Sequence, residues 1–151
     1  MTSRASIDRF LDRTAIAVVG VSRSGKGFGN LAARELRRKG YQLYVVHPEA
    51  DVIDGDRCYR GLADLPETVR ALLVVVPPDQ AVDVVRQAAA HGIRHVWLQQ
   101  GAQSAEVLRV CAELGLDTVA GECILMFAKP TGVHKAHWWV WRLLGKLPEA
   151  A

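Results

Sequence analysis

Five short apolar runs alternate with segments of helical spacing, and this alternation most constrains how the chain can fold. The runs are rich in β-branched residues and lack the polar alternation of a half-exposed strand. Strands buried on both faces have this pattern, and they are typical of parallel sheets covered by helices. The predicted strands are residues 15–20, 42–47, 71–76, 94–98 and 117–120.

The segments between these runs have the spacing of amphipathic helices. In two of them apolar residues recur at i, i+3, i+4 and i+7, at Ala81, Val84, Val85 and Ala88, and at Val107, Val110, Cys111 and Leu114. Three helices are expected to end at glycines that close the last turn, Gly40, Gly92 and Gly115. Asp79 and Ser104 stand where N-caps are expected.

Strand–helix alternation with short connections predicts a Rossmann-like, doubly wound, mostly parallel five-stranded α/β sheet. Residues 49–66 interrupt the alternation of strands and helices and are interpreted as a crossover with at most a short helix. We expect one domain over residues 1–151, with a core at 14–126 and a helical tail at 133–147.

Composition restricts the class of protein. A chain of 151 residues with 50% hydrophobic content suffices for one full core. The net charge of +3 favours small anionic ligands only weakly and argues against nucleic acid as a partner. We find neither a signal peptide nor a run of about 18 apolar residues for a membrane span. The three widely spaced cysteines fit a reducing compartment, so we expect a cytoplasmic protein.

A glycine-rich loop, VVGVSRSGKGFGN, follows the first predicted strand and opens the first helix at residues 18–30. In doubly wound sheets this position binds phosphate at the helix N-terminus. Glycines let backbone N–H groups approach an anion, and Arg23 and Lys26 add positive charge. The loop therefore predicts phosphate binding, whichever chemistry uses it.

A nucleotide hydrolase is the first candidate, because residues 20–26 fit the pattern G-x-x-x-x-G-K. That loop needs Ser or Thr next to ligate magnesium, and Gly27 stands there instead. The third and fourth strands are followed by Pro77-Pro78 and Gln99-Gln100, which offer no carboxylate for the metal. These features argue against a hydrolase.

A dinucleotide oxidoreductase is the second candidate. Ser22 replaces the central glycine of G-x-G-x-x-G, and His47-Pro48 stands where NAD requires an acidic residue after the second strand. An imidazole suits a phosphorylated ribose better than a bare ribose diol. A small NAD(P)-dependent oxidoreductase or a nucleotide sensor remains the alternative interpretation.

Four blocks in order point to a third candidate: the glycine loop, YVVHPEADVIDGDRCYRGLADLP, VVVPPDQAVDVVRQAAAHGIRHVWLQQGA and LGLDTVAGECILM. Over residues 14–126 they resemble the stand-alone CoA-binding domain proteins, which are similar to the N-terminal CoA-binding domain of the succinyl-CoA ligase α subunit. The resemblance implies a Rossmann-type protein that binds coenzyme A or an acyl-CoA.

The resemblance also implies which residues bind the cofactor. The loop would hold the CoA phosphates, through Gly20, Val21, Ser22, Arg23, Ser24, Gly25, Lys26, Gly27, Phe28 and Gly29. The adenosine part would lie by Val46, His47 and Pro48, and the wall of the pocket would be formed by Val76, Pro77 and Pro78, with Gln99, Gln100 and Gly101 on the far side.

The chain departs from the ligase in two respects. Glu49-Ala50-Asp51 follows Pro48 where the ligase has a lysine, and there is no room for the ligase's phosphohistidine domain. Neither paired carboxylates nor a nucleophile–base pair is evident in the sequence. We therefore predict a binding protein with no catalytic residues of its own and no metal.

Three further features have both structural and functional interpretations. Cys123 either faces the thiol of a bound CoA or packs inertly, and packing is favoured. His134 and His137 lack a firm third metal ligand and fit ordinary surface histidines or a contact to the bound ligand. The tryptophan-rich tail HKAHWWVWRLLGKL fits a membrane-surface helix or a packing surface. We favour packing, on the sheet, on a second copy in a homodimer, or on an acyl-CoA enzyme.

Overall fold

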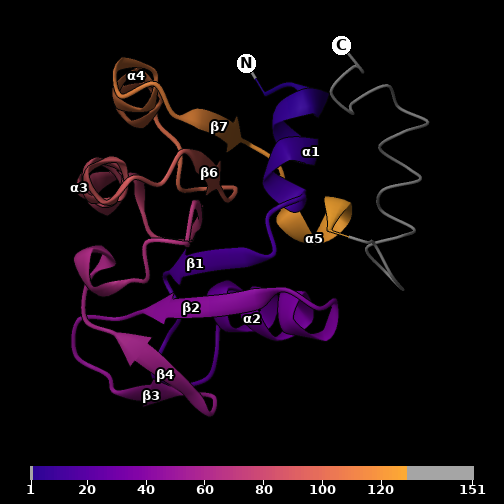
Figure 1. Cartoon of the computed structure of the whole chain (residues 1–151), viewed down its shortest axis with the longest axis vertical. Coiled ribbons are helices and arrows are strands. Elements are labelled where there is room, and N and C mark those ends of the chain that lie inside the picture. Colours follow the sequence, from indigo (N-terminus) through magenta and orange to yellow (C-terminus); the bar gives the residue numbers. More distant parts are fainter. Residues whose placement is uncertain (1, 129–151) are drawn as a thin grey trace.

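A single seven-stranded sheet forms the centre of the protein in the computed structural model, which describes residues 2–128 (Figure 1). The strands are β1 (Ala15–Val19), β2 (Gln42–Val46), β3 (Val52–Ile53), β4 (Asp56–Tyr59), β5 (Ala71–Val74), β6 (His95–Leu98) and β7 (Asp117–Ala120). Their order is β3-β4-β2-β1-β5-β6-β7, and every neighbouring pair is parallel except β3 and β4. The prediction of a mostly parallel Rossmann-like sheet is confirmed.

The predicted number of five strands is wrong, because residues 49–66 contain the hairpin of β3 and β4. Asp54 and Gly55 form its turn with φ of 50° and 86°. An Asp-Gly pair with two positive φ angles is typical of a tight hairpin. Both strands are short, and β4 carries charged residues, so neither shows the apolar run that marks the buried strands. The short helix expected in this segment is the 3-10 helix η1 (Leu62–Asp64).

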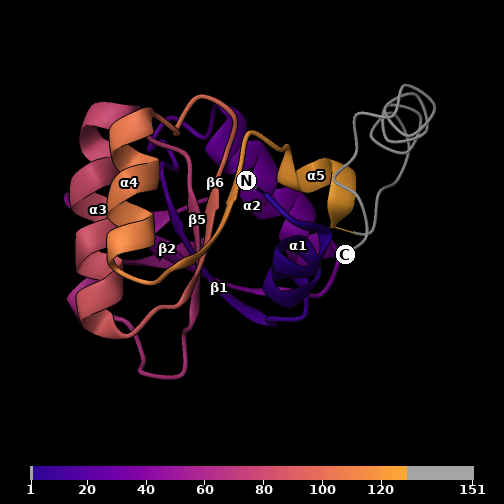
Figure 2. The ribbon, with the colours of Figure 1, turned by 90° about the horizontal axis from the view of Figure 1, so that it is seen from above.

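Helices cover both faces of the sheet (Figure 2). One face carries α1 (Arg4–Leu11), α2 (Phe28–Arg38) and α5 (Ile124–Phe127), and the other carries α3 (Pro78–His91) and α4 (Ala105–Glu113). The Ser104 hydroxyl accepts a hydrogen bond from Val107 N, which confirms the N-cap of α4. The predicted N-cap at Asp79 is wrong: Pro77 holds that position, since proline with its fixed φ is suited to a helix start.

The core consists of two apolar layers, one on each face of the sheet, because strand side chains alternate between the faces. Ile16 and Val18 point into the layer beneath α1 and α2, whereas Ala17 joins the layer beneath α3 and α4. All three are fully buried. This confirms that the apolar runs are strands covered on both sides.

Helix α1 and the short helix α5 were not predicted from the sequence, and both pack around Trp97. The Trp97 ring meets Phe10 of α1 edge-on, with 5.4 Å between ring centroids, and lies 6.0 Å from Phe127 of α5. Trp97 Nε1 donates to the carbonyl of Glu122 at 3.0 Å. Burying a side chain the size of Phe10 contributes about 2–3 kcal/mol, so α1 is an integral part of the fold.

An ion pair holds α1 to the amino end of β7. Arg9 donates through Nε and Nη2 to the two carboxylate oxygens of Asp117, at 2.7 and 3.1 Å. Ser6 and His95 also lie against this pair. The hydrogen bond from Arg9 is the largest cause that lowers the pKa of Asp117 from 3.8 to about 2.

Asp117→Asn is expected to lower the free energy of unfolding at neutral pH by about 1–2 kcal/mol, after allowance for solvent screening. A lowered pKa means that the carboxylate stabilises the fold above its unfolded-state pKa. That stabilisation is lost between about pH 4 and pH 2. Urea denaturation across this range should therefore bring the two curves together as pH falls. Asp83→Asn, at an exposed position of α3, is the control, and a difference that persists undiminished at the lowest pH would contradict the assignment.

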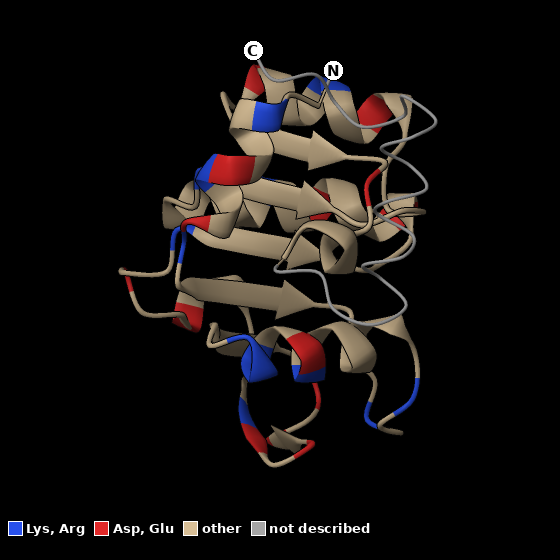
Figure 3. Cartoon of the chain, turned by 90° about the vertical axis from the view of Figure 1, so that its right-hand side faces the viewer, with Lys and Arg blue, Asp and Glu red and all other residues tan. Residues whose placement is uncertain are grey.

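The strand order places a crevice at the carboxyl ends of β1 and β5. The chain runs from β1 to β2 and β4 on one side, then returns to β5 on the other side of β1. Apart from the edge strand β3, this is the order of a dinucleotide-binding Rossmann sheet, in which ligands bind where the order reverses. Figure 3 shows strands of the sheet side by side and pointing the same way.

The structure bears on two further expectations. Among residues 2–128, no helix combines the length and hydropathy needed to cross a membrane. The expected helical tail at 133–147, with His134 and His137 and the proposed docking surface, lies outside the described residues.

Candidate functional site

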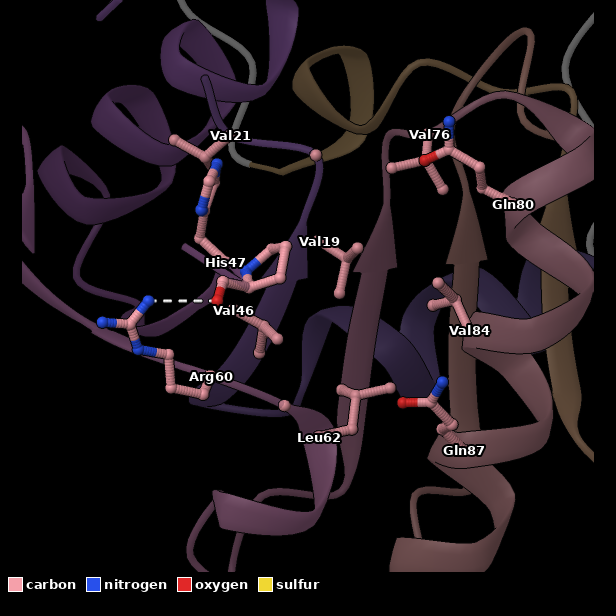
Figure 4. Close-up of a pocket in the computed structure, with 13 residues that line it drawn as sticks. Val19, Val21, Val46, His47, Arg60, Leu62, Val76, Gln80, Val84 and Gln87 are labelled. Atoms are coloured by element: carbon pink, nitrogen blue, oxygen red, sulfur yellow. Dashed lines mark hydrogen bonds between the residues drawn. The ribbon is translucent and has the colours of Figure 1, made fainter. Parts of the chain in front are cut away.

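A pocket of about 390 Å³ opens at the carboxyl edge of the sheet, at the reversal of strand order (Figure 4). The ends of β1, β2 and β5 form one part of its wall, and the segment after β4 and one side of α3 form the rest. The lining residues are Val19, Gly20, Val21, Val46, His47, Pro48, Arg60, Gly61, Leu62, Val76, Gln80, Val84 and Gln87. An apolar pocket with a few polar groups is typical of a small-molecule site.

The predicted site residues divide into two groups in the structure. Gly20, Val21, Val46, His47, Pro48 and Val76 line the pocket together. The remainder of the glycine loop continues from the pocket to the start of α2, and Pro77 and Pro78 begin α3. Gln99, Gln100 and Gly101 follow β6 and do not line it.

The glutamines after β6 have structural partners. Gln99 is almost fully buried, and its Oε1 accepts a hydrogen bond from Ile124 N at 3.2 Å. Gln100 Nε2 donates to the carbonyl of Gly121 at 3.2 Å. These bonds tie the end of β6 to the chain that follows β7 and to the first residue of α5. In this arrangement the two side chains support the fold next to the site.

Two glycines of the loop are required by close backbone packing. A Cβ on Gly20, whose φ is 111°, would lie 2.4 Å from the carbonyl oxygen of Val75. A Cβ on Gly29 would lie 2.2 Å from the carbonyl oxygen of Gly20. A Cβ on Gly27, whose φ is 108°, would meet nothing within 4 Å. Gly29 therefore lets α2 lie close to the chain leaving β1, Gly20 lets that chain lie close to the chain leaving β5, and Gly27 leaves open space beside the loop.

A buried asparagine holds the loop in shape. Asn30 has no exposed surface, and its Oδ1 accepts from Ser22 N at 2.9 Å. Its Nδ2 donates to Ser22 O at 2.9 Å and to Asp54 Oδ2 at 3.1 Å. Arg34 donates both to Gly25 O and to Asp54 Oδ2. The β3–β4 hairpin, through Asp54, thus helps to fix the conformation of the glycine loop.

The charges around this loop are of both signs. On α2 and the hairpin below it, basic and acidic residues are interspersed, as Figure 3 shows. Arg37 pairs with Asp56, and Arg23 lies 3.4 Å from Glu49 in an exposed ion pair. The positive charge that the sequence places in the loop is therefore partly compensated.

The helices that begin beside the pocket lack side-chain caps. Gly27 and Pro77, the N-caps of α2 and α3, make no side-chain hydrogen bond to the first turn. The N-caps of α1 and α4 are Ser3 and Ser104, and both hydroxyls accept such a bond. First-turn N–H groups without a side-chain acceptor favour an anion at the helix N-terminus.

His47 presents a hydrogen-bond donor at the end of β2. Its Nδ1 accepts from the backbone N–H groups of Glu49 and Ala50, at 3.1 and 3.0 Å. A ring nitrogen that accepts hydrogen bonds carries no proton, so the ring proton lies on Nε2. The side chain can donate to a ligand there but, unlike a carboxylate, cannot accept from two ribose hydroxyls.

Seven lining residues were missed by sequence reasoning: Val19, Arg60, Gly61, Leu62, Gln80, Val84 and Gln87. Gln80, Val84 and Gln87 lie on one side of α3 at spacings of four and three, a regularity visible in the sequence. Arg60 and Leu62 follow the unpredicted strand β4. Their place in the pocket depends on the parallel pairing of β4 with β2.

The three cysteines lie outside the pocket lining. Cys58 and Cys111 are buried, and desolvation raises the pKa of both thiols. Cys123 is half-buried at the N-cap of α5 and packs against the core. The packed interpretation of Cys111 agrees with its place in the core beneath α4.

The fold and the pocket define a Rossmann-like α/β domain with a candidate ligand site at the reversal of strand order. The chain belongs to the CoA binding domain family, whose profile matches residues 14–129. The resemblance inferred from the four sequence blocks is thereby confirmed.

Individual relatives agree with this assignment. A conserved hypothetical protein from Pyrococcus furiosus, whose structure is known, is 35% identical in sequence to this chain. The two structures match with a TM-score of 0.70 over 74% of this chain and 96% of that one. A hypothetical protein from Pyrococcus horikoshii OT3 is 30% identical, with a TM-score of 0.74, over 80% of this chain and 86% of that one. ADP-forming acetate–CoA ligase II of Archaeoglobus fulgidus is 28% identical over 66% of this chain and 16% of the ligase. This chain spans 16% to 19% of the length of the first three curated relatives it matches.

Proposed function

We propose that the protein binds coenzyme A, free or acylated, at the pocket on the carboxyl edge of its sheet. The observation that carries this proposal is the convergence of the ends of β1, β2 and β5 on a pocket whose β2 side offers hydrogen-bond donors and no carboxylate. Membership in the CoA binding domain family supports the same ligand.

The pocket matches the chemistry of the nucleotide end of CoA. Apolar residues such as Val19, Leu62 and Val84 would contact the adenine, and Gln80 and Gln87 offer amides to its polar edge. The diphosphate would lie by the glycine loop, where the uncapped first turn of α2 favours an anion. The pantetheine arm would then leave along the carboxyl edge of the sheet.

The proposal is limited to binding. Among the thirteen described residues of the pocket lining, His47 alone could act as a general base, and no serine, threonine, cysteine, lysine or carboxylate stands beside it as a nucleophile or a partner. The ligases among the relatives are several times longer than this chain. We therefore assign it no ligase reaction, and propose that it holds CoA without transforming it.

NADP is the second candidate ligand. Donors at the end of β2 also suit the phosphate on the ribose of NADP, and the strand order is that of dinucleotide-binding domains. NAD fits less well, because His47 replaces the carboxylate that would accept from its ribose hydroxyls. A nucleotide sensor or a small oxidoreductase would use this same site.

Isothermal titration calorimetry with CoA, acetyl-CoA, NADP, NAD and ATP tests the proposal. We expect CoA or acetyl-CoA to bind at least about tenfold more tightly than NAD or ATP, a difference of about 1.4 kcal/mol. Tight binding of NADP without CoA would favour the second candidate. Tight binding of NAD or ATP without CoA would refute the proposed function.

A further inference from the structure

Arg60 alone among the thirteen described residues of the pocket lining carries a fixed positive charge. We infer that Arg60, with His47 beside it, binds the phosphate on the adenosine ribose, so that the protein selects CoA over its 3′-dephospho form. The inference rests on the proposed function, because it assigns one group of the same ligand to one part of the same pocket.

The guanidinium of Arg60 is held in place by the turn that follows β2. Nη1 donates to the carbonyl of Pro48 at 3.0 Å, and Nη2 donates to Asp51 Oδ1 at 2.6 Å. A guanidinium has five N–H donors, so these two bonds leave others for a ligand. An arginine anchored through part of its fork is well suited to bind a phosphate with the remainder.

The location of Arg60 indicates that the phosphate it binds is the one on the adenosine ribose. In Rossmann folds the residue after the second strand contacts the adenosine ribose, and an arginine nearby accommodates a phosphate on it. His47 and Arg60 lie on the β2 side of the pocket, opposite Gln80, Val84 and Gln87 of α3 (Figure 4). With the ring proton on Nε2, His47 adds a second donor on this side.

Two carboxylates lie near Arg60 and His47 without lining the pocket. Asp51, the partner of Arg60, has a side chain that is 85% exposed, and Glu49 is paired with Arg23 on the surface. Attraction between such exposed charges is weak because water screens it. A dianionic phosphate at the pocket would compete well with Asp51 for the guanidinium. The absence of any Asp or Glu from the described lining means that no carboxylate would repel that phosphate within the pocket.

Calorimetry with CoA and 3′-dephospho-CoA tests the inference on the wild-type chain and on Arg60→Gln. We expect the wild type to prefer CoA by about 10- to 100-fold, the range of a charge-assisted hydrogen bond. Arg60→Gln should weaken CoA binding until the preference is lost, with unchanged affinity for dephospho-CoA. Arg57→Gln is the matched control: it removes the same charge from an exposed residue of β4 outside the pocket, and should keep the preference.

The possible failures are distinct. A wild-type protein that binds both ligands equally would overturn this inference and leave the proposed function intact, whether or not the variants fold. A preference that survives in Arg60→Gln would also overturn it, since the phosphate would then be bound elsewhere. A wild-type protein that binds neither ligand would overturn the proposed function and this inference with it.

Discussion

Val84→Trp is expected to weaken CoA binding at least about 100-fold, with a change in the free energy of unfolding within about 1 kcal/mol. Val84 is on α3, and its partly exposed side chain lines the pocket opposite the ends of β1 and β2. An indole there would occupy the space that we assign to the adenine. Because the added atoms extend into an open pocket, the core beneath α3 has no need to rearrange.

Calorimetry with CoA and urea denaturation measure the two expected effects of Val84→Trp separately. Ala90→Trp is the control, because it places the same indole on an exposed position of α3 outside the pocket. It should leave both the affinity and the stability close to those of the wild type. Unchanged CoA affinity in Val84→Trp would mean that the nucleotide binds elsewhere on the molecule.

Gly20→Ala is expected to lower the free energy of unfolding by about 3–5 kcal/mol, from steric overlap together with backbone strain. The added Cβ would lie 2.4 Å from the carbonyl oxygen of Val75, which belongs to the chain leaving β5. This contact is with backbone, so no side chain can rotate away to relieve it. The residue also has a φ of 111°, which strains any residue with a Cβ.

Gly40→Ala separates these two causes. Gly40 also has a positive φ, of 93°, but nothing lies within 4 Å of a Cβ built on it. Its replacement should cost only the strain, about 1–2 kcal/mol. Urea denaturation of both variants measures the difference. If Gly20→Ala were no more destabilised than Gly40→Ala, the close approach of β1 to the chain after β5 would not be a determinant of stability.

The glycine loop shows what a sequence motif predicts and what it leaves open. Its position after the first strand and before a helix is as predicted. Its glycines nevertheless look alike in the sequence and have different roles in the structure. Gly25, for example, has a φ of 71°, and a Cβ on it would lie 3.2 Å from Asp54 Oδ1. A substitution there would therefore disturb the loop's own support as well as any ligand.

The hairpin of β3 and β4 was missed for a specific reason. Its Asp54-Gly55 turn is a recognised hairpin signal, but the strands on either side are too short to show a period of two. Helix α1 was missed because its apolar residues are few, and Ile7 and Phe10 are fully buried only through contacts with distant residues such as Trp97.

The sequence by itself determined the five buried strands, the helices between them, the position of the glycine loop between β1 and α2, and the family. These features are local: they follow from apolar periodicity, from glycines at helix ends and from the order of short motifs. Only the tertiary structure decided which residues share the pocket. Arg60 reaches it because β4 pairs with β2, and Val84 because α3 packs across the reversal point. Gln99 and Gln100 were separated from it by their bonds to the segment after β7. Such contacts join residues far apart in the chain, so no local pattern encodes them.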